Sequence, residues 1–388
     1  MTIRKNAYGK CLKYIEKYWE KTTVKFPHDK KIHIGLPHQY VAPNSALFRN
    51  DQFYWDSYFI IVGLLESGRT RLAKGMVDNL INLYERFGIM PSRNRFHNLG
   101  ISQPPFFTSM ILEVYKKNKD REWLGKAAKL AENELEKYWM RAIHPKHKVF
   151  YGLSRYCDHF ITHATAENES GWDMTSRFND QCLDFLPIDL NALLFRYEKD
   201  LVRMFTILKS DEKKNYYAAR AGMRKKEIND FMWNRNRGFF FDYNYKKKKQ
   251  SDFYSLAGFY PMWAGIASSK QVKRMVENLD VFEYEGGLAN TQKQELFKDY
   301  RQWDYPNGWA NQHWIVINGL QKYGFKSDAE RLAIKWLDLN KKIFNRTGKF
   351  WEKYDVVGCK IGHSGRYNTQ SGFGWTNAIF LKLANMFG

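Results

Sequence analysis

The sequence predicts an all-α fold, an (α/α)6 toroid in which six helical hairpins close a ring and short β-hairpins occupy some of the loops. Apolar residues recur with a period near 3.6 in about a dozen segments of the 388-residue chain, which is the pattern of amphipathic helices. These segments follow one another in pairs, and twelve helices are enough for six hairpins. The expected helices cover residues 3–21, 54–67, 70–87, 105–118, 120–142, 187–209, 210–232, 258–267, 269–279, 308–324, 325–341 and 372–387.

The expected helix at 325–341 illustrates the pattern. Ser327 and Glu330 have the spacing of a capping box, in which each side chain accepts from a free backbone N–H at the start of a helix. Leu332 and Trp336 then follow at a spacing of four and belong to one apolar stripe. We therefore expect this helix to begin at its capping box.

Short strands are expected between some of the helices. Residues 238–243 and 347–354 have a β-type composition and follow turns that contain glycine. In the second segment, the alternation of a strand would place Phe350, Glu352 and Tyr354 on the same face.

The composition limits the class of protein. Apolar residues make up 44% of the chain, which excludes a disordered protein. No Pro-, Gly- or Ser-rich linker and no repeat of fixed length divides the sequence, so residues 1–388 are expected to form a single domain. The formal charge of +21 attracts anions and raises nucleic-acid binding as a minor hypothesis. No basic stripe with interleaved aromatic residues supports it, and nucleic acid is not an expected partner.

Several sequence motifs are absent, and their absence determines the cellular location and the cofactors that we expect. No stretch reaches the ~18 apolar residues of a membrane helix, and the basic N-terminus lacks the apolar region of a signal peptide. The four cysteines form no CxxC pair and indicate reduced thiols in a cytoplasmic protein. The ten histidines show no HExxH spacing, and phosphate-binding glycine motifs are missing. Neither a metal nor another cofactor is expected.

Four segments combine aromatic residues with carboxylates, amides and glycines. A sugar ring has apolar C–H faces and a rim of hydroxyls, so its pocket needs flat aromatic walls and polar acceptors. The combination favours a small carbohydrate as the ligand. Simpler interpretations remain open, because Asp173 has the setting of a helix N-cap and Glu352 that of a solvated charge on a hairpin. The four segments are 53–58, 169–174, 302–309 and 370–377.

The same segments carry the motifs of a known family. Residues 302–310 read Q-W-D-Y-P-N-G-W-A, and residues 54–58 read Y-W-D-S-Y. With S-Q-P-P at 102–105 and S-G-W-D at 170–173, they follow the order and approximate spacing of glycoside hydrolase family 37, the trehalases, which the chain resembles over most of its length. The more distant family 63 shares the S-G-W-D element. The resemblance implies an (α/α)6 fold and hydrolysis of a glycoside.

The resemblance also implies roles for individual residues. Asp173 matches the general acid of the family and Glu352 its general base, which implies an inverting hydrolase of α,α-trehalose or a related small α-glycoside. The carboxyl groups of such a pair lie about 6.5–9.5 Å apart and leave room for a water molecule. The acid must be protonated and the base ionised, so their surroundings must differ. The residues expected to bind substrate are Trp55, Asp56, Gln103, Gly171, Trp303, Asp304, Asn307 and Arg366.

Several positions depart from the family pattern. One substrate-binding arginine of the family falls on Phe48, unless Arg49 replaces it after a shift of one residue, and another falls on Ile101. Ser92 stands for an asparagine, and Arg366 stands for a glutamate of the pocket. Because a guanidinium suits a carboxylate or phosphate, an anionic α-glycoside bound by Arg366 is one alternative substrate. A sugar-binding barrel without activity is the other alternative, although the acid and the base are both present.

Overall fold

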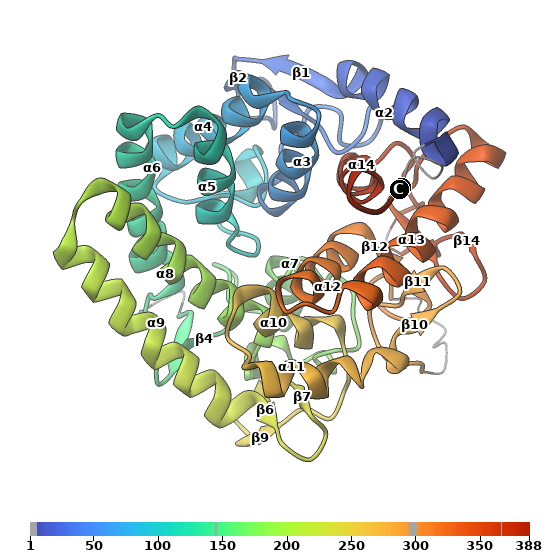
Figure 1. Cartoon of the computed structure of the whole chain (residues 1–388). Coiled ribbons are helices and arrows are strands. Elements are labelled where there is room, and N and C mark those ends of the chain that lie inside the picture. Colours follow the sequence, from blue (N-terminus) through green and yellow to red (C-terminus); the bar gives the residue numbers. More distant parts are fainter. Residues whose placement is uncertain (1–5, 144–145, 295–300, 366) are drawn as a thin grey trace.

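The computed structural model describes residues 6–143, 146–294, 301–365 and 367–388, which form a ring of helices (Figure 1). Thirteen α-helices lie within these ranges. Six of them form an inner ring, six form an outer ring, and the short helix α7 (His163–Glu169) belongs to a loop. The expected (α/α)6 toroid is confirmed.

The inner helices contact one another in a closed cycle. Each packs against the next along the chain, and α14 packs against α3, so segments from opposite ends of the sequence lie side by side (Figure 1). These helices are buried on almost every side. In α3, each residue from position 54 to position 65 is buried. The inner helices are α3 (Tyr54–Glu66), α5 (Phe107–Asn118), α8 (Ile188–Leu208), α10 (Tyr260–Ala264), α12 (Ala310–Lys322) and α14 (Gly374–Phe387).

The outer helices bury only one stripe each, as helices between a core and solvent do. In α9, the buried residues Tyr217, Ala221, Arg224, Ile228 and Met232 recur at spacings of three and four. The outer helices are α2 (Gly9–Thr22), α4 (Thr70–Phe87), α6 (Arg121–Glu134), α9 (Asp211–Met232), α11 (Ser269–Val276) and α13 (Lys326–Thr347).

Small antiparallel sheets connect the helices. The sheet that matters most for the site joins β12 (Asn307–Trp309), β13 (Lys353–Asp355) and β14 (Lys360–Ile361). The remaining pairs are β1 (Thr23–Phe26) with β2 (Leu36–Val41), β3 (Lys148–Phe150) with β4 (Leu153–Ser154), β5 (Phe185–Leu186) with β8 (Tyr243–Asn244) and β9 (Lys249–Gln250), β6 (Trp233–Asn234) with β7 (Phe239–Phe240), and β10 (Glu283–Tyr284) with β11 (Gly287–Leu288). Short helical turns are η1 (Asn6–Tyr8), η2 (Phe96–Asn98), η3 (Leu135–Trp139), η4 (Cys182–Asp184), η5 (Leu256–Phe259) and η6 (Leu279–Val281).

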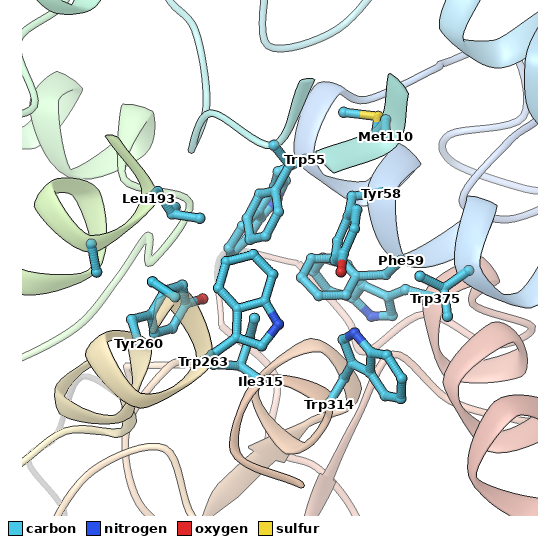
Figure 2. Close-up of a cluster of buried hydrophobic side chains, with 14 of the residues drawn as sticks. Trp55, Tyr58, Phe59, Met110, Leu193, Tyr260, Trp263, Trp314, Ile315 and Trp375 are labelled. Atoms are coloured by element: carbon cyan, nitrogen blue, oxygen red, sulfur yellow. The ribbon is translucent and has the colours of Figure 1, made fainter. Parts of the chain in front are cut away.

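Large aromatic side chains from the inner helices fill the centre of the ring (Figure 2). The Phe59 ring lies 6.3 Å from Trp55 and 6.1 Å from Trp375, and the Tyr58 ring lies 6.2 Å from Trp263, measured between centroids. Each such side chain contributes roughly 1.5–3 kcal/mol when it is fully buried. The barrel is therefore packed through its middle, and a cavity lies toward each of its two ends.

Two boundary predictions are wrong. Helix α13 begins at Lys326, so Ser327 and Glu330 lie inside its first turns and do not form the expected capping box. The same helix continues to Thr347 and ends at Gly348, whose φ of +67° suits glycine. The expected strand at 347–354 is consequently reduced to β13.

Three other segments also differ from expectation. The expected strand at 238–243 is divided between β7 and β8, which belong to different sheets. The expected helix at 258–267 is the turn η5 followed by a five-residue α10, which stops at Gly265 with a φ of +91°. Helix α7 has no predicted counterpart. All four cysteines are free thiols, and no helix of the described ranges is long and apolar enough to cross a membrane.

Candidate active site

A cavity of about 350 Å³ opens at the end of the ring where α3, α12 and α14 begin. Loops that precede or connect the helices supply its walls. Both predicted catalytic residues line it, together with a group of aromatic side chains. The main aromatic residues of the wall are Phe48, Phe53, Trp55, Trp303, Trp309, Trp375 and Tyr367.

Asp173 lies on a loop that begins where α7 ends. Thr162 and Thr165 form a capping box at the start of α7. After the helix, Gly171 has a φ of +72°, and a Cβ there would lie 2.6 Å from the indole of Trp55. Only glycine lets this backbone lie flat against the tryptophan. The predicted N-cap role of Asp173 is not observed, because no helix begins at Met174.

Buried Glu169 anchors this loop to the barrel. It accepts hydrogen bonds from the hydroxyl of Tyr138 and from the backbone N–H of Cys157, the latter at 2.7 Å. Nε2 of His147 lies 3.3 Å from Oε2 of the same carboxyl group. Burial opposes ionisation, but His147 and these hydrogen bonds outweigh it and lower the pKa of Glu169. The carboxylate therefore stays charged and fixes the segment that leads to Asp173.

The segment 301–304 holds the loop from its other side. Asp304 accepts from the hydroxyl of Thr175 at 2.7 Å and from the N–H of Ser176 at 2.9 Å. Nε2 of Gln302 donates to the main-chain oxygen of Asp173. The Q-W-D part of the 302–310 motif thus forms direct hydrogen bonds with the loop that carries the predicted acid.

Stacked tryptophans form the flat part of the wall. Trp303 and Trp309 lie parallel at 4.1 Å between ring centroids, with an angle of 1° between their planes. Trp55 lies 5.5 Å from Trp303, and Trp375 stands almost perpendicular to Trp309 at 5.6 Å. Such a surface suits the apolar face of a sugar ring.

Glu352 is brought to the same cavity by strand pairing. Lys353 of β13 pairs with Trp309 of β12, so Glu352, which comes just before the strand, lies beside the tryptophan wall. Its side chain is only 1% exposed. Oε2 accepts from Nζ of Lys353 at 2.8 Å, and Oε1 accepts from the hydroxyl of Tyr367 at 2.7 Å. The predicted solvated charge on a hairpin is therefore wrong.

The expected strand face at Glu352 is wrong as well. Consecutive side chains of a strand point to opposite faces. Glu352 and Lys353 nevertheless form an ion pair, because Glu352 lies in a bend just before β13. The carboxylate thus has a buried cation as its neighbour in addition to aromatic rings.

Asp56 is the third carboxyl group of the cavity and lies in the first turn of α3. Burial raises its pKa well above the usual value, and the charges of Glu352 and Asp173 raise it further. The cavity therefore favours the protonated form of Asp56, which can donate a hydrogen bond as well as accept one.

The structure divides the predicted binding residues into three groups. Trp55, Asp56, Gln103, Gly171 and Trp303 line the cavity together with Asp173 and Glu352. Asp304 and Asn307 do not line it. Asn307 donates to the backbone oxygen of Gln302 and accepts from the N–H of His363, so both residues hold loops in place. Arg366 lies outside the described residues.

The polar side chains of the cavity that sequence reasoning missed include Arg93 and Tyr367. Arg93 directly follows Ser92, a position where the sequence departs from the family pattern, and that departure was the signal that could have found it. Tyr367 follows Arg366 and lies three residues before the segment 370–377. Among the described residues, no group of three or more His, Cys, Asp or Glu side chains has the arrangement of a metal site.

An (α/α)6 ring with carboxyl groups on loops around an aromatic cavity defines the class of protein, a glycoside hydrolase of the helical-toroid type. Comparison with known proteins agrees with this class, because the model of the trehalase family matches residues 3–168 and 157–388. The chain belongs to the trehalase family.

Individual relatives support the same assignment. The periplasmic trehalase of Xanthomonas oryzae is 33% identical over 91% of this chain and 69% of its own. The structure of the neutral trehalase Nth1 from Saccharomyces cerevisiae superposes with a TM-score of 0.82 at 30% identity, covering 90% of this chain and 74% of that one. A family 63 mannosylglycerate hydrolase from Thermus thermophilus shares the fold, with a TM-score of 0.72 at 19% identity over 96% of this chain and 99% of its own.

The expected cytoplasmic location is wrong. Similar bacterial proteins from Xanthomonas and Pseudomonas are named periplasmic trehalases. Free cysteines and the sequence near residue 1 were the only grounds for the prediction, and neither identifies a compartment.

Proposed function

We propose that the protein hydrolyses a small α-glycoside with inversion, and that α,α-trehalose is the first substrate to test. The observation that carries the proposal is that Asp173 and Glu352, which come from separate loops, line one cavity with an aromatic wall. The cavity of about 350 Å³ falls at the lower end of the range for small-molecule sites, which suits a disaccharide.

In the proposed reaction, Asp173 gives its proton to the glycosidic oxygen while Glu352 removes a proton from the attacking water. The bond from the anomeric carbon to the leaving oxygen breaks as the bond to the water oxygen forms, which inverts that carbon. Lys353 and Tyr367 donate to Glu352, so each of its carboxyl oxygens has a fixed hydrogen-bond donor. Asp56 and Asp173 repel each other when both are charged, so the cavity disfavours a state in which all its carboxyl groups are ionised.

Proton NMR during the first minutes of trehalose hydrolysis tests the mechanism. Inversion at one anomeric carbon releases one β-glucose and one α-glucose, and the two anomers are distinct before they interconvert. Release of α-glucose alone would rule out the water-activating role of Glu352. No hydrolysis of trehalose or of other small α-glucosides would rule out the function.

We also propose that residues 1–388 act as one catalytic domain with a small carbohydrate as ligand. The support is the contact of α14 with both α2 and α3, which joins the two ends of the chain. A location outside the cytoplasm is proposed from the names of the bacterial relatives. Fractionation of expressing cells into periplasmic and cytoplasmic extracts tests it by activity.

A further inference from the structure

Arg93 contributes a guanidinium to the outer wall of the cavity. Its backbone forms a β-bridge with Phe53, directly before α3, and its guanidinium lies 5.1 Å from the centre of the Phe53 ring. The neighbouring Ser92 is fixed on both sides, because its N–H donates to Ile101 at 2.8 Å and its carbonyl accepts from Tyr54 at 2.9 Å. Arg93 is thus held by a rigid segment, with 21% of its side chain exposed to the cavity and solvent.

The charge of Arg93 is only weakly compensated within the protein. Its Nε donates to Oδ1 of Asn98 at 3.0 Å, which is a neutral partner. Its Nη1 lies 3.8 Å from Oδ2 of Asp51, beyond hydrogen-bond distance. Asp51 is already occupied by Nε of Arg95 at 2.7 Å and by His33 at 3.3 Å. The Nη groups of Arg93 therefore have hydrogen-bond capacity that the described residues do not use.

The position of Arg93 relative to the carboxyl groups indicates which part of a substrate it meets. Burial and the nearby Arg95 lower the pKa of Arg93, while Asp51, Asp173 and Tyr367 act in the opposite direction. Arg93 thus lines the same cavity as Asp173, whose charge acts on it, and in the proposed reaction the acid faces the leaving group.

We propose that Arg93 binds the leaving group and selects one that carries a carboxylate over a neutral one of the same shape. The proposal rests on the proposed glycosidase function. A guanidinium binds a carboxylate through two parallel N–H donors, and Arg93 has its Nη groups available for this. The N-terminal ends of α3, α12 and α14 at this end of the ring also favour negative charge.

The test compares α-D-glucosylglycerate with α-D-glucosylglycerol, which differ in one carboxylate, and uses α-D-glucosyl fluoride as reference. Fluoride has no group for Arg93 to bind and departs without a proton from the acid. We expect the wild-type kcat/KM for the glycerate to exceed that for the glycerol at least tenfold. In Arg93→Met, the kcat/KM ratio of glycerate to fluoride should fall about 10–100-fold, the effect of one hydrogen-bonded charge pair.

Two further variants make the test decisive. Arg93→Lys keeps the positive charge but lacks the two parallel N–H donors of a guanidinium. This variant should therefore retain only part of the preference for the glycerate. Arg86→Met changes an arginine of α4 that pairs with Asp29 at the surface and should leave the ratio unchanged. Equal rates for glycerate and glycerol in the wild type, or an equal loss for all three substrates in both Arg93 variants, would overturn the proposal. Failure of the wild type on glucosyl fluoride would instead refute the glycosidase function on which it rests.

Discussion

The two ends of the helical ring each hold a cavity, and the larger one is not the candidate active site. The end where the inner helices begin has about 350 Å³ and contains Asp56, Asp173 and Glu352. The end where they finish has about 530 Å³, and most of its charged residues are basic. The basic residues of that far end are Lys116, Lys117, Arg196, Arg203, Lys322 and Lys382.

Helix polarity explains this difference in charge. The C-terminal end of a helix presents unpaired carbonyl groups and partial negative charge, which cations stabilise. Lys322 donates to the carbonyl of Trp263 near the end of α10 at 2.8 Å, and Lys382 donates to Glu66 at the end of α3 at 2.7 Å. Neither the volume nor the charge of a cavity identifies a catalytic site here. The carboxyl groups of Asp173 and Glu352, which lie on loops, are the reason why we propose the active site at the opposite end.

The largest expected effect is a loss of catalysis when the proposed acid or base is changed. Asp173→Asn and Glu352→Gln keep the shape of each side chain but remove its proton-transfer function, so kcat should fall about 10²–10⁴-fold. Steady-state kinetics on trehalose measures the loss, and isothermal titration should still show sugar binding. Glu113→Gln, at the far end, is the control and should keep its kcat. Loss of less than tenfold in both catalytic variants would contradict the assigned roles.

Removal of the cation beside the base should have the next largest effect. Lys353→Met leaves the buried carboxylate of Glu352 without its ion-pair partner, so we expect kcat to fall about tenfold or more.

The conservative variant Lys353→Arg provides the control for this change. It restores the positive charge beside Glu352 and should recover part of the lost kcat. An unchanged kcat in Lys353→Met would show that the lysine only supports packing against Trp309, whose ring lies 4.9 Å from Nζ.

At the far end, removal of one partner from a buried ion pair should lower the stability of the protein and leave its activity unchanged. Asp200 is fully buried and accepts from Arg196 at 2.8 Å, from Arg203 at 3.1 Å and from Ser109 at 2.9 Å. Asp200→Asn leaves two cations without their counter-charge, which should lower the free energy of unfolding by about 3 kcal/mol. Urea denaturation measures this loss, and kcat on trehalose is the internal control. A large fall in kcat with unchanged stability would mean that the far end takes part in catalysis.

The fold was more predictable from the sequence than the roles of the site residues. Apolar periodicity located most ring helices, because each of them must bury a stripe or its whole surface. Periodicity could not show that Asp304 and Asn307 point away from the cavity and into loop contacts. A motif records which residues occur together, whereas the local backbone decides which of them face the ligand. Arg93 was missed for the same reason, since its position depends on how the 91–95 segment pairs with Phe53.

The smallest expected effect concerns the pH dependence of stability at the far end. Burial, and then the charge of Arg196, lower the pKa of Lys322 to about 7, against about 10.5 in the unfolded chain. Arg203 lowers it further, whereas Asp200 and Glu113 oppose the shift. Between these two pH values the unfolded state binds more protons, so this lysine makes the folded protein more stable as the pH rises.

Lys322→Met should therefore reduce the rise in the free energy of unfolding between pH 7 and pH 10. The difference in unfolding free energy between wild type and variant should shift in favour of the wild type from pH 7 to pH 10. The shift should be modest, because part of the Lys322 side chain is exposed and solvent screens its charge. Urea titrations at several pH values measure it, with the exposed Lys270→Met of α11 as the matched control. If the two variants respond identically to pH, Lys322 keeps an ordinary charge, and the cations of the far end stabilise the ends of the inner helices without an electrostatic cost of their own.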